Sequence, residues 1–232
     1  MINYILSSPS GNILADVLLG LLLLPAILLS LTLHECAHGW AASKLGDNTA
    51  KNLGRLTLDP AKHLDLMGTI CMLLFGFGWA KPVPINSRYF KKPRRDMALT
   101  ALAGPTTNLL LGFVFILLSR IVLSVSGLIT FEEGSRTDYF LFLFYLLFSY
   151  AGQLNVYLAV FNLLPIPPFD GSRIFFIFLP VKWYFGIMKY ERYIQIAILV
   201  LLWLGVLTIP LSLISGLLIS LMNKLIDLIP FL

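Results

Sequence analysis

Four long apolar stretches constrain this chain more than any other feature of its sequence. They cover residues 13–43, 97–125, 139–164 and 194–229. Each is long enough to cross a bilayer as a helix, which takes about 20 mainly apolar residues. Of the 232 residues 58% are hydrophobic and 12% are charged, where a soluble domain carries about 25% charged residues. The sequence therefore predicts an integral membrane protein in contact with the lipid bilayer, and it excludes soluble and disordered proteins and binding to nucleic acid.

Two features leave the number of spans open. Pro210 lies inside the fourth stretch and predicts either a kink or a division into two helices. The apolar piece at residues 64–79 is too short to span, and its glycines, with Pro82 and Pro84 behind it, are typical of a broken path. We expect an all-α polytopic membrane protein with about four to six transmembrane helices and a re-entrant segment at about residues 64–90. Residues 1–232 should form a single domain, without a separate soluble domain.

The distribution of positive charge predicts the orientation. Fourteen of the 17 Lys and Arg residues lie in two regions, residues 44–95 and 173–192. Positively charged loops stay on the cytoplasmic side of a membrane, and both regions share one side if residues 64–79 return to the side they entered. We therefore expect a multi-pass protein of the cell membrane with its N-terminus outside. No Lys or Arg precedes the first stretch, so we expect no cleaved signal peptide.

The inner end of the first stretch carries the pattern His34-Glu35-Cys36-Ala37-His38. Residues four apart lie on one helix face, so His34 and His38 can bind a single metal ion. Glu35 stands next to them, where a general base for hydrolysis is needed. Ionisable groups on one turn of a membrane helix are costly unless they have a function. Cys36 points to the other side of the helix and is expected to pack there.

A zinc ion held by two histidines needs a third protein ligand and keeps its fourth position for water. The apolar segments contain few acids, and Asp16 lies about two thirds of a membrane away on the same helix. Asp170 follows a proline-rich break on the cytoplasmic side and is the best candidate. The alternative is that Asp170 caps a short helix beginning at Gly171. We expect Asp170 to be the ligand, because a carboxylate at membrane depth needs a strong partner.

Three further polar residues need an interpretation. Asn108 and Asn162 each place an amide inside an apolar span. They either hold helices together or hold a substrate carbonyl or a developing oxyanion. Asn162 lies eight residues before Asp170, close to the break, and is the better candidate for substrate binding. His63, in a basic loop, is interpreted as a surface or interfacial residue.

These motifs together resemble the site-2 protease (M50) family of intramembrane zinc proteases, in its compact prokaryotic form without a PDZ or CBS domain. The resemblance runs from about Ser30 to Arg173. It rests on the following segments: His34-Glu35-x-x-His38, Arg55-Leu56-Thr57-Leu58-Asp59-Pro60, Gly76-Phe77-Gly78-Trp79-Ala80-Lys81-Pro82-Val83-Pro84, Ala103-Gly104-Pro105-Thr106-Thr107-Asn108, Asn162-Leu163-Leu164-Pro165 and Phe169-Asp170-Gly171.

The resemblance implies zinc bound by His34, His38 and Asp170, with Glu35 as the general base. It implies that Asn162 contacts the substrate main chain and that Asn108 lines the site. The re-entrant segment would contain a β element around Trp79–Asn86 that pairs with a locally unwound transmembrane substrate. The expected activity is hydrolysis of peptide bonds within or near transmembrane segments, as in regulated intramembrane proteolysis.

Other functions stay open on the sequence alone. A metal transporter would use histidines and carboxylates along an ion path, but the spans contain too few of them to continue one. A metalloprotease with its motif in a soluble lobe would need a late glutamate ligand, and Glu191 is the only glutamate after residue 133. A non-catalytic metal-binding scaffold is the last alternative, and the presence of Glu35 speaks against it. The oligomeric state and the substrate are not encoded in any motif.

Overall fold

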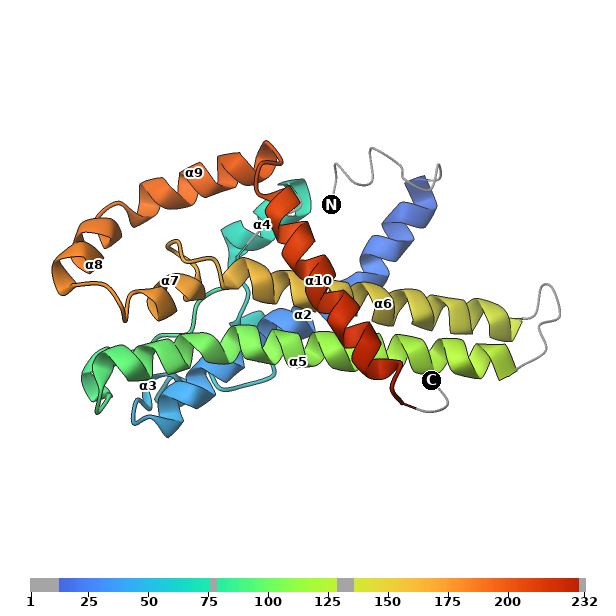
Figure 1. Cartoon of the computed structure of the whole chain (residues 1–232), viewed down its shortest axis with the longest axis horizontal. Coiled ribbons are helices and arrows are strands. Elements are labelled where there is room, and N and C mark those ends of the chain that lie inside the picture. The colour runs from blue at the N-terminus through green and yellow to red at the C-terminus, as the bar shows by residue number, and fades with distance from the viewer. Residues whose placement is uncertain (1–12, 76–78, 129–135, 230–232) are drawn as a thin grey trace.

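The computed structural model describes residues 13–75, 79–128 and 136–229, which are mostly helical (Figure 1). Four helices are long and apolar enough to cross a membrane: α2, α5, α6 and α10. The chain is therefore an all-α polytopic membrane protein. The elements, in order, are α2 (Ile13–Lys44), α3 (Thr49–Asn52), η1 (Pro60–Lys62), α4 (Leu66–Phe75), η2 (Ser87–Tyr89), α5 (Pro93–Leu128), α6 (Arg136–Asn162), α7 (Asp170–Phe175), α8 (Val181–Met188), α9 (Glu191–Trp203) and α10 (Thr208–Ile226).

Helices α5 and α6 form an antiparallel pair along the length of the molecule (Figure 1). Small residues allow the two helices to approach closely, as is common in membranes. A Cβ on Gly152 would lie 2.7 Å from a side-chain carbon of Ile116, and one on Gly112 would lie 2.8 Å from Val156. Helix α10 crosses this pair, and its Ile226 is buried in one cluster with Ile116 and Val156.

Helix α2 packs against both α5 and α6. Asn155 of α6 donates a hydrogen bond to the Ser30 hydroxyl of α2, with 2.8 Å between the two atoms, and both side chains are fully buried. Polar contacts of this kind hold helices together where lipid offers no hydrophobic driving force. The contact between Asn155 and Ser30 fixes the position of the C-terminal half of α2, which carries the histidine motif.

The chain between α2 and α5 forms a loop around α4 whose two ends lie side by side. Leu64 and Ala80 form an antiparallel β-bridge, and the N–H of Lys81 donates to the carbonyl of His63 over 2.8 Å. Helix α4 lies between these two ends. A Cβ on Gly68 would lie 2.1 Å from the Trp79 carbonyl oxygen, so only glycine allows the returning chain this close. In the described residues the β structure is limited to this bridge; Gly76 and Gly78 lie outside them.

The fourth apolar stretch forms two helices, α9 and α10, and not one kinked helix. The division lies at residues 204–207, where Gly205 has a φ of +75° that favours glycine. Pro210 lies in the first turn of α10, where a missing N–H costs nothing. With 13 residues, α9 is too short to span a bilayer.

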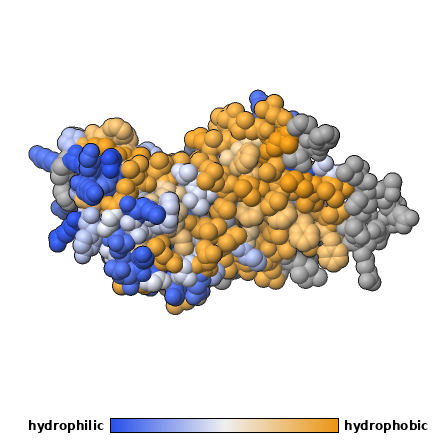
Figure 2. All heavy atoms as spheres, turned by 90° about the horizontal axis from the view of Figure 1, so that it is seen from below, coloured by the Kyte–Doolittle hydropathy of each residue, from blue (hydrophilic) through white to orange (hydrophobic). Residues whose placement is uncertain are grey.

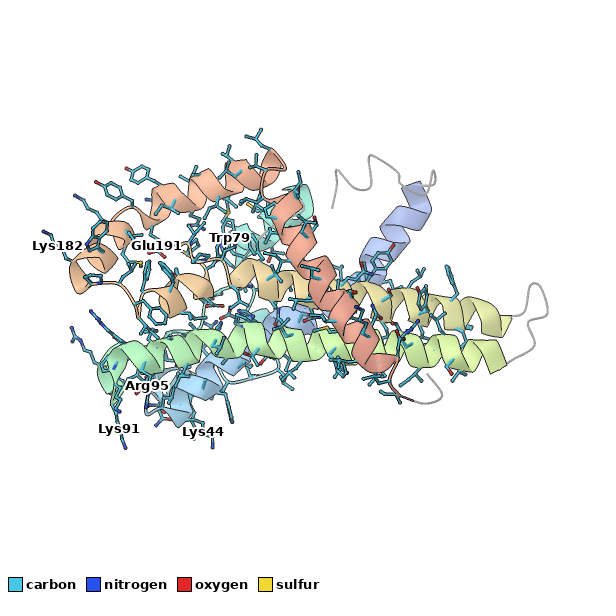
Figure 3. All side chains as sticks on the ribbon, viewed as in Figure 1. Lys44, Trp79, Lys91, Arg95, Lys182 and Glu191 are labelled. Atoms are coloured by element: carbon cyan, nitrogen blue, oxygen red, sulfur yellow. The ribbon has the colours of Figure 1, made fainter. Side chains whose placement is uncertain are left out.

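Hydrophilic side chains gather at one end of the molecule, whereas the middle of the visible face is apolar (Figure 2). The hydrophilic end contains the C-terminal end of α2, α3 and the first turns of α5, with Lys44, Lys91 and Arg95 (Figure 3). The histidine motif lies on α2 close to this end.

Candidate metal centre

His34 and His38 lie on the same face of α2, with their Nε2 atoms 3.0 Å apart. The carboxylate of Asp170 meets them from α7, and its Oδ2 lies 3.1 Å from each Nε2. Both histidines are buried, and only 12% of the Asp170 side chain is exposed. The chain thus brings Asp170 to two histidines that precede it by more than 130 residues in sequence.

The proline-rich break after α6 directs Asp170 toward the histidines. Helix α6 ends at Asn162, and α7 begins at Asp170 itself. A Cβ on Gly171 would lie 2.1 Å from the Leu163 carbonyl oxygen, so the two segments can pack this closely only with glycine there. The N-cap of α7 is Phe169, without a side-chain capping bond. The interpretation of Asp170 as a helix cap is therefore excluded.

Hydrogen bonds at the far side of each imidazole set its orientation. The Nδ1–H of His38 donates to the Thr100 carbonyl over 2.8 Å, and that of His34 donates to the Asn108 Oδ1 over 3.3 Å. A neutral imidazole that donates through Nδ1 has its lone pair on Nε2. Metal-binding histidines almost always have such a partner on the second nitrogen.

The three converging atoms are therefore all acceptors. A carboxylate binds a metal ion in its ionised form. Two imidazole lone pairs and a carboxylate oxygen about 3 Å apart repel one another unless a cation lies between them.

The donor set fits zinc. Two imidazole nitrogens and one carboxylate oxygen lie within 4.8 Å of one another. Ligands of a tetrahedral zinc ion, each at about 2.0–2.1 Å, lie about 3.3 Å from each other, close to the spacing found here. Three protein ligands leave one coordination position for water or substrate, as in catalytic zinc sites. Within the described ranges this is the only group of three or more potential metal ligands. These three side chains, His34, His38 and Asp170, are called the metal cluster below.

Gly104 of α5 lies directly against the two imidazoles. A Cβ at this position would be 2.4 Å from Nε2 of His38 and 2.6 Å from Cε1 of His34. Glycine thus leaves the space that the histidine pair occupies. The sequence motif contains Gly104, but its role was not predicted. A usable signal is its spacing from Asn108, because residues four apart on a helix share one face.

Glu35, next to His34 on α2, does not join the metal cluster. Its Oε2 accepts a hydrogen bond from the backbone N–H of Val83 over 2.9 Å. The loop that carries Val83 is fixed on both sides: Lys81 is bonded to His63, and the N–H of Asn86 donates to Oδ2 of Asp47 over 2.6 Å. The loop between α4 and α5 thus passes beside the expected general base. No sequence pattern predicted the contact with Val83.

The two asparagines occupy different positions. Asn108 is fully buried, bonds His34, and has no partner for its Nδ2 atom. Asn162 donates to the Leu158 carbonyl one turn earlier in α6, and no bond between it and the metal cluster is found. Of the two, Asn108 is the residue in contact with the cluster; the sequence favoured Asn162 for substrate binding, which is a different role. Substrate binding by either residue stays a prediction.

The interpretation of His63 as a surface residue is wrong. His63 is 1% exposed, and its Nε2 lies 2.9 Å from the Thr57 carbonyl and 3.8 Å from the sulfur of Cys36. It is buried because η1 turns it back against α2, where it ties the start of the re-entrant segment to the helix that carries the site. Cys36 packs here, away from the metal cluster, and both cysteines are free.

Comparisons with known proteins agree with this geometry. Residues 22–137 and 120–207 match the family described as "Peptidase family M50". A protein of Bacillus subtilis named "Putative zinc metalloprotease YwhC" is 49% identical over 150 residues, which cover 64% of each chain. A protein of Mycolicibacterium smegmatis named "Putative zinc metalloprotease Rip2" is 29% identical over 156 residues, which cover 65% of this chain and 54% of that protein. The matched part thus spans less than two thirds of either relative. No solved structure matches the chain.

Proposed function

The chain belongs to peptidase family M50, and on that premise we propose that it is an intramembrane zinc metalloprotease. Its reaction is the hydrolysis of peptide bonds within or near transmembrane segments of other membrane proteins, as in regulated intramembrane proteolysis. The observation that carries the proposal is the convergence of His34, His38 and Asp170 beside Glu35, at one end of a membrane-spanning helix.

The residues have distinct roles in this proposal. His34, His38 and Asp170 hold the zinc ion, and Thr100 and Asn108 keep the two imidazoles oriented. Bound zinc supplies Lewis acidity that polarises the scissile carbonyl and favours ionisation of water. Glu35 accepts the proton of the attacking water and returns it to the leaving amine. Gly104 keeps the site open for both imidazoles.

The substrate has to lose its helical structure at the cleaved bond, because a peptide bond inside a helix is shielded from attack. An extended segment can be held by pairing with exposed backbone. The loop from Trp79 to Asn86 runs past Glu35. Pro82 and Pro84 have no N–H, and the N–H of Val83 is bonded to Glu35, so residues 82–84 would pair through their carbonyl groups, which accept from substrate N–H groups. We propose that the substrate pairs along this loop beside Val83.

The orientation is part of the proposal. The hydrophilic end of the molecule, near which the metal cluster lies, carries most of the Lys and Arg residues. The positive-inside rule places this end in the cytoplasm and the N-terminus outside. In cells that express a variant whose single cysteine is introduced by Lys91→Cys, a membrane-impermeant thiol reagent should label the protein only after the cells are opened. Labelling of the protein in intact cells would contradict the proposed orientation.

Cleavage by purified protein tests the function. The full chain, reconstituted in lipid vesicles with zinc, should cleave an added transmembrane peptide, whereas the Glu35→Gln variant should bind zinc and leave the peptide intact. A metal transporter would instead move zinc across the vesicle wall. Zinc flux without cleavage, or cleavage that persists in the variant, would overturn the proposal.

A further inference from the structure

A cavity of about 340 Å³ lies beside the metal cluster, enclosed by the loop after the re-entrant segment, the start of α5, α7 and the start of α9. Its wall includes Val83, whose N–H is bonded to Glu35. It also includes Pro168 and Ser172, which lie two residues before and two residues after Asp170. The cavity therefore shares a wall with the proposed base and with the proposed third zinc ligand.

An extended peptide reaches this cavity directly from the site. A strand advances about 3.3 Å per residue. A substrate that is cleaved beside Glu35 and continues along the loop past Val83 and Ile85 enters the cavity within a few residues. The cavity is thus placed to receive the segment next to the scissile bond.

The floor of the cavity is apolar. Val83 and Phe176 are buried, and Met97, Ile177 and Met188 are half-buried around them. The volume lies at the lower end of the range for ligand sites, roughly 300–1,000 Å³. It can take an apolar side chain, and the unbranched methionines can adapt to different shapes.

The edge of the cavity is charged, unlike its floor. Arg94 and Arg173 are exposed, and Glu191 at the start of α9 is half-buried. None of the three takes part in an ion pair with another residue in the described part of the chain. The two guanidinium groups outnumber the one carboxylate, so the edge carries net positive charge and can bind a carboxylate.

This charge has a consequence for the choice of substrate. Transmembrane segments ordinarily carry Lys and Arg at their cytoplasmic ends, and the orientation proposed above brings that end to the cavity. Arg94 and Arg173 would repel such a segment. A segment with Asp or Glu in the same place would be attracted, so repulsion of the common type and attraction of the rare type act together.

We propose that this cavity selects substrates, binding an apolar side chain next to the cleaved bond and an acidic residue that follows it. The substrate class is a membrane protein whose transmembrane segment is followed, on the side of the site, by Asp or Glu and not by Lys or Arg. Arg94 and Arg173 determine the preference, and Glu191 limits it. The inference rests on the proposed function, in which the cleaved bond lies at the zinc site, the substrate runs along the loop beside Val83 and the site faces the cytoplasm.

The test uses three synthetic peptides with one apolar segment of about 20 Leu and Ala residues. They differ only in whether Asp, Asn or Lys occupies the positions that follow this segment. Binding is measured by fluorescence anisotropy on the zinc-loaded Glu35→Gln chain in lipid nanodiscs, and cleavage is measured on the unaltered chain. We expect the Asp peptide to bind and to react roughly tenfold better than the Lys peptide, with the Asn peptide between them.

Charge reversal in the protein should invert this order. The double variant Arg94→Glu/Arg173→Glu should prefer the Lys peptide, and the milder Arg94→Gln/Arg173→Gln should lose the preference for Asp, because only the charge of Glu191 then remains at the edge. Lys91→Glu is the matched control, because Lys91 is exposed at the same end of the molecule and is not part of the lining (Figure 3). It should keep the preference for Asp. Glu191→Gln should enlarge that preference.

The outcomes separate this inference from the proposed function. Cleavage of all three peptides at equal rates, with equal binding, leaves the protease standing and overturns the selective cavity. Charge-dependent binding without cleavage supports the cavity and overturns the protease. A preference for Asp that survives both double variants, in protein that still holds one zinc ion per chain, assigns the selectivity elsewhere and overturns the inference.

Discussion

The carboxylate of Glu35 accepts a hydrogen bond from the backbone N–H of Val83, 48 residues further along the chain, over 2.9 Å. Val83 stands between Pro82 and Pro84, neither of which has an N–H to offer. The general base proposed here is therefore held by the one N–H within this three-residue segment. The loop after α4 thus holds the proposed base and also lines the cavity that we propose for substrate selection.

Replacement of Glu35 by Gln should separate metal binding from catalysis. The amide oxygen of Gln can still accept the N–H of Val83, so the loop should keep its position, but the amide cannot accept a proton. We expect zinc content unchanged and the rate of peptide cleavage lower by about 10²–10⁴-fold. Metal analysis and a cleavage assay on the same preparation measure both. Loss of zinc in this variant would show that Glu35 has a structural role instead.

Gly104 should be sensitive to the smallest possible addition. A methyl group at Gly104 would lie 2.4 Å from the Nε2 of His38, so Gly104→Ala should displace an imidazole and weaken zinc binding by about 10–100-fold. Gly186→Ala in α8 is the matched control, because a Cβ there meets nothing within 4 Å. Competition with a zinc-selective dye measures the affinity. Equal affinities of the two variants would contradict the packing described for the site.

The residues of the metal centre could be predicted from the sequence because each rests on a local rule. His34 and His38 have helical spacing, and Asp170 is an acid where acids are scarce. Their convergence could not be derived, because it depends on the packing of α7 against α5 after a proline-rich break. The same holds for Gly104, whose role arises only when α5 meets the imidazoles.

The overall fold could be predicted, since length and hydropathy alone indicate the spanning helices. Two details of the fold could not be predicted. The last apolar stretch is divided at Gly205, which has a positive φ. In the sequence this glycine is no stronger a signal for a helix end than the nearby Pro210. The burial of His63 depends on a contact with Thr57 and Cys36, so its basic surroundings in the sequence suggested the wrong environment.

The two asparagines should differ in what they affect. Asn108→Ala removes the acceptor for the Nδ1–H of His34, so zinc affinity should fall by about 10–100-fold. Asn162→Ala should leave zinc affinity unchanged, because its amide bonds the Leu158 carbonyl of its own helix. If Asn162 contacts the substrate main chain, its replacement should raise KM. Zinc titration and steady-state kinetics distinguish the two. A fall in zinc affinity for Asn162→Ala would contradict this assignment.

Asp170→Asn should test the third ligand with little change in shape. The amide has nearly the volume of the carboxylate but lacks its charge, and two histidines alone hold zinc weakly. We expect zinc affinity to fall by more than about 100-fold, beyond the loss found for residues that only orient a ligand. Far-ultraviolet circular dichroism checks that the helices persist. Full zinc occupancy in the variant would exclude Asp170 from the coordination sphere.

Zinc K-edge X-ray absorption on the purified Glu35→Gln chain tests the central claim most directly. The account predicts one zinc ion per chain with only nitrogen and oxygen neighbours at about 2.0–2.1 Å, including a signal from two imidazoles. A sulfur neighbour at about 2.3 Å would indicate that Cys36 or Cys71 binds the metal. That result, or the absence of zinc from both the unaltered chain and the Glu35→Gln chain, would contradict a centre built from His34, His38 and Asp170.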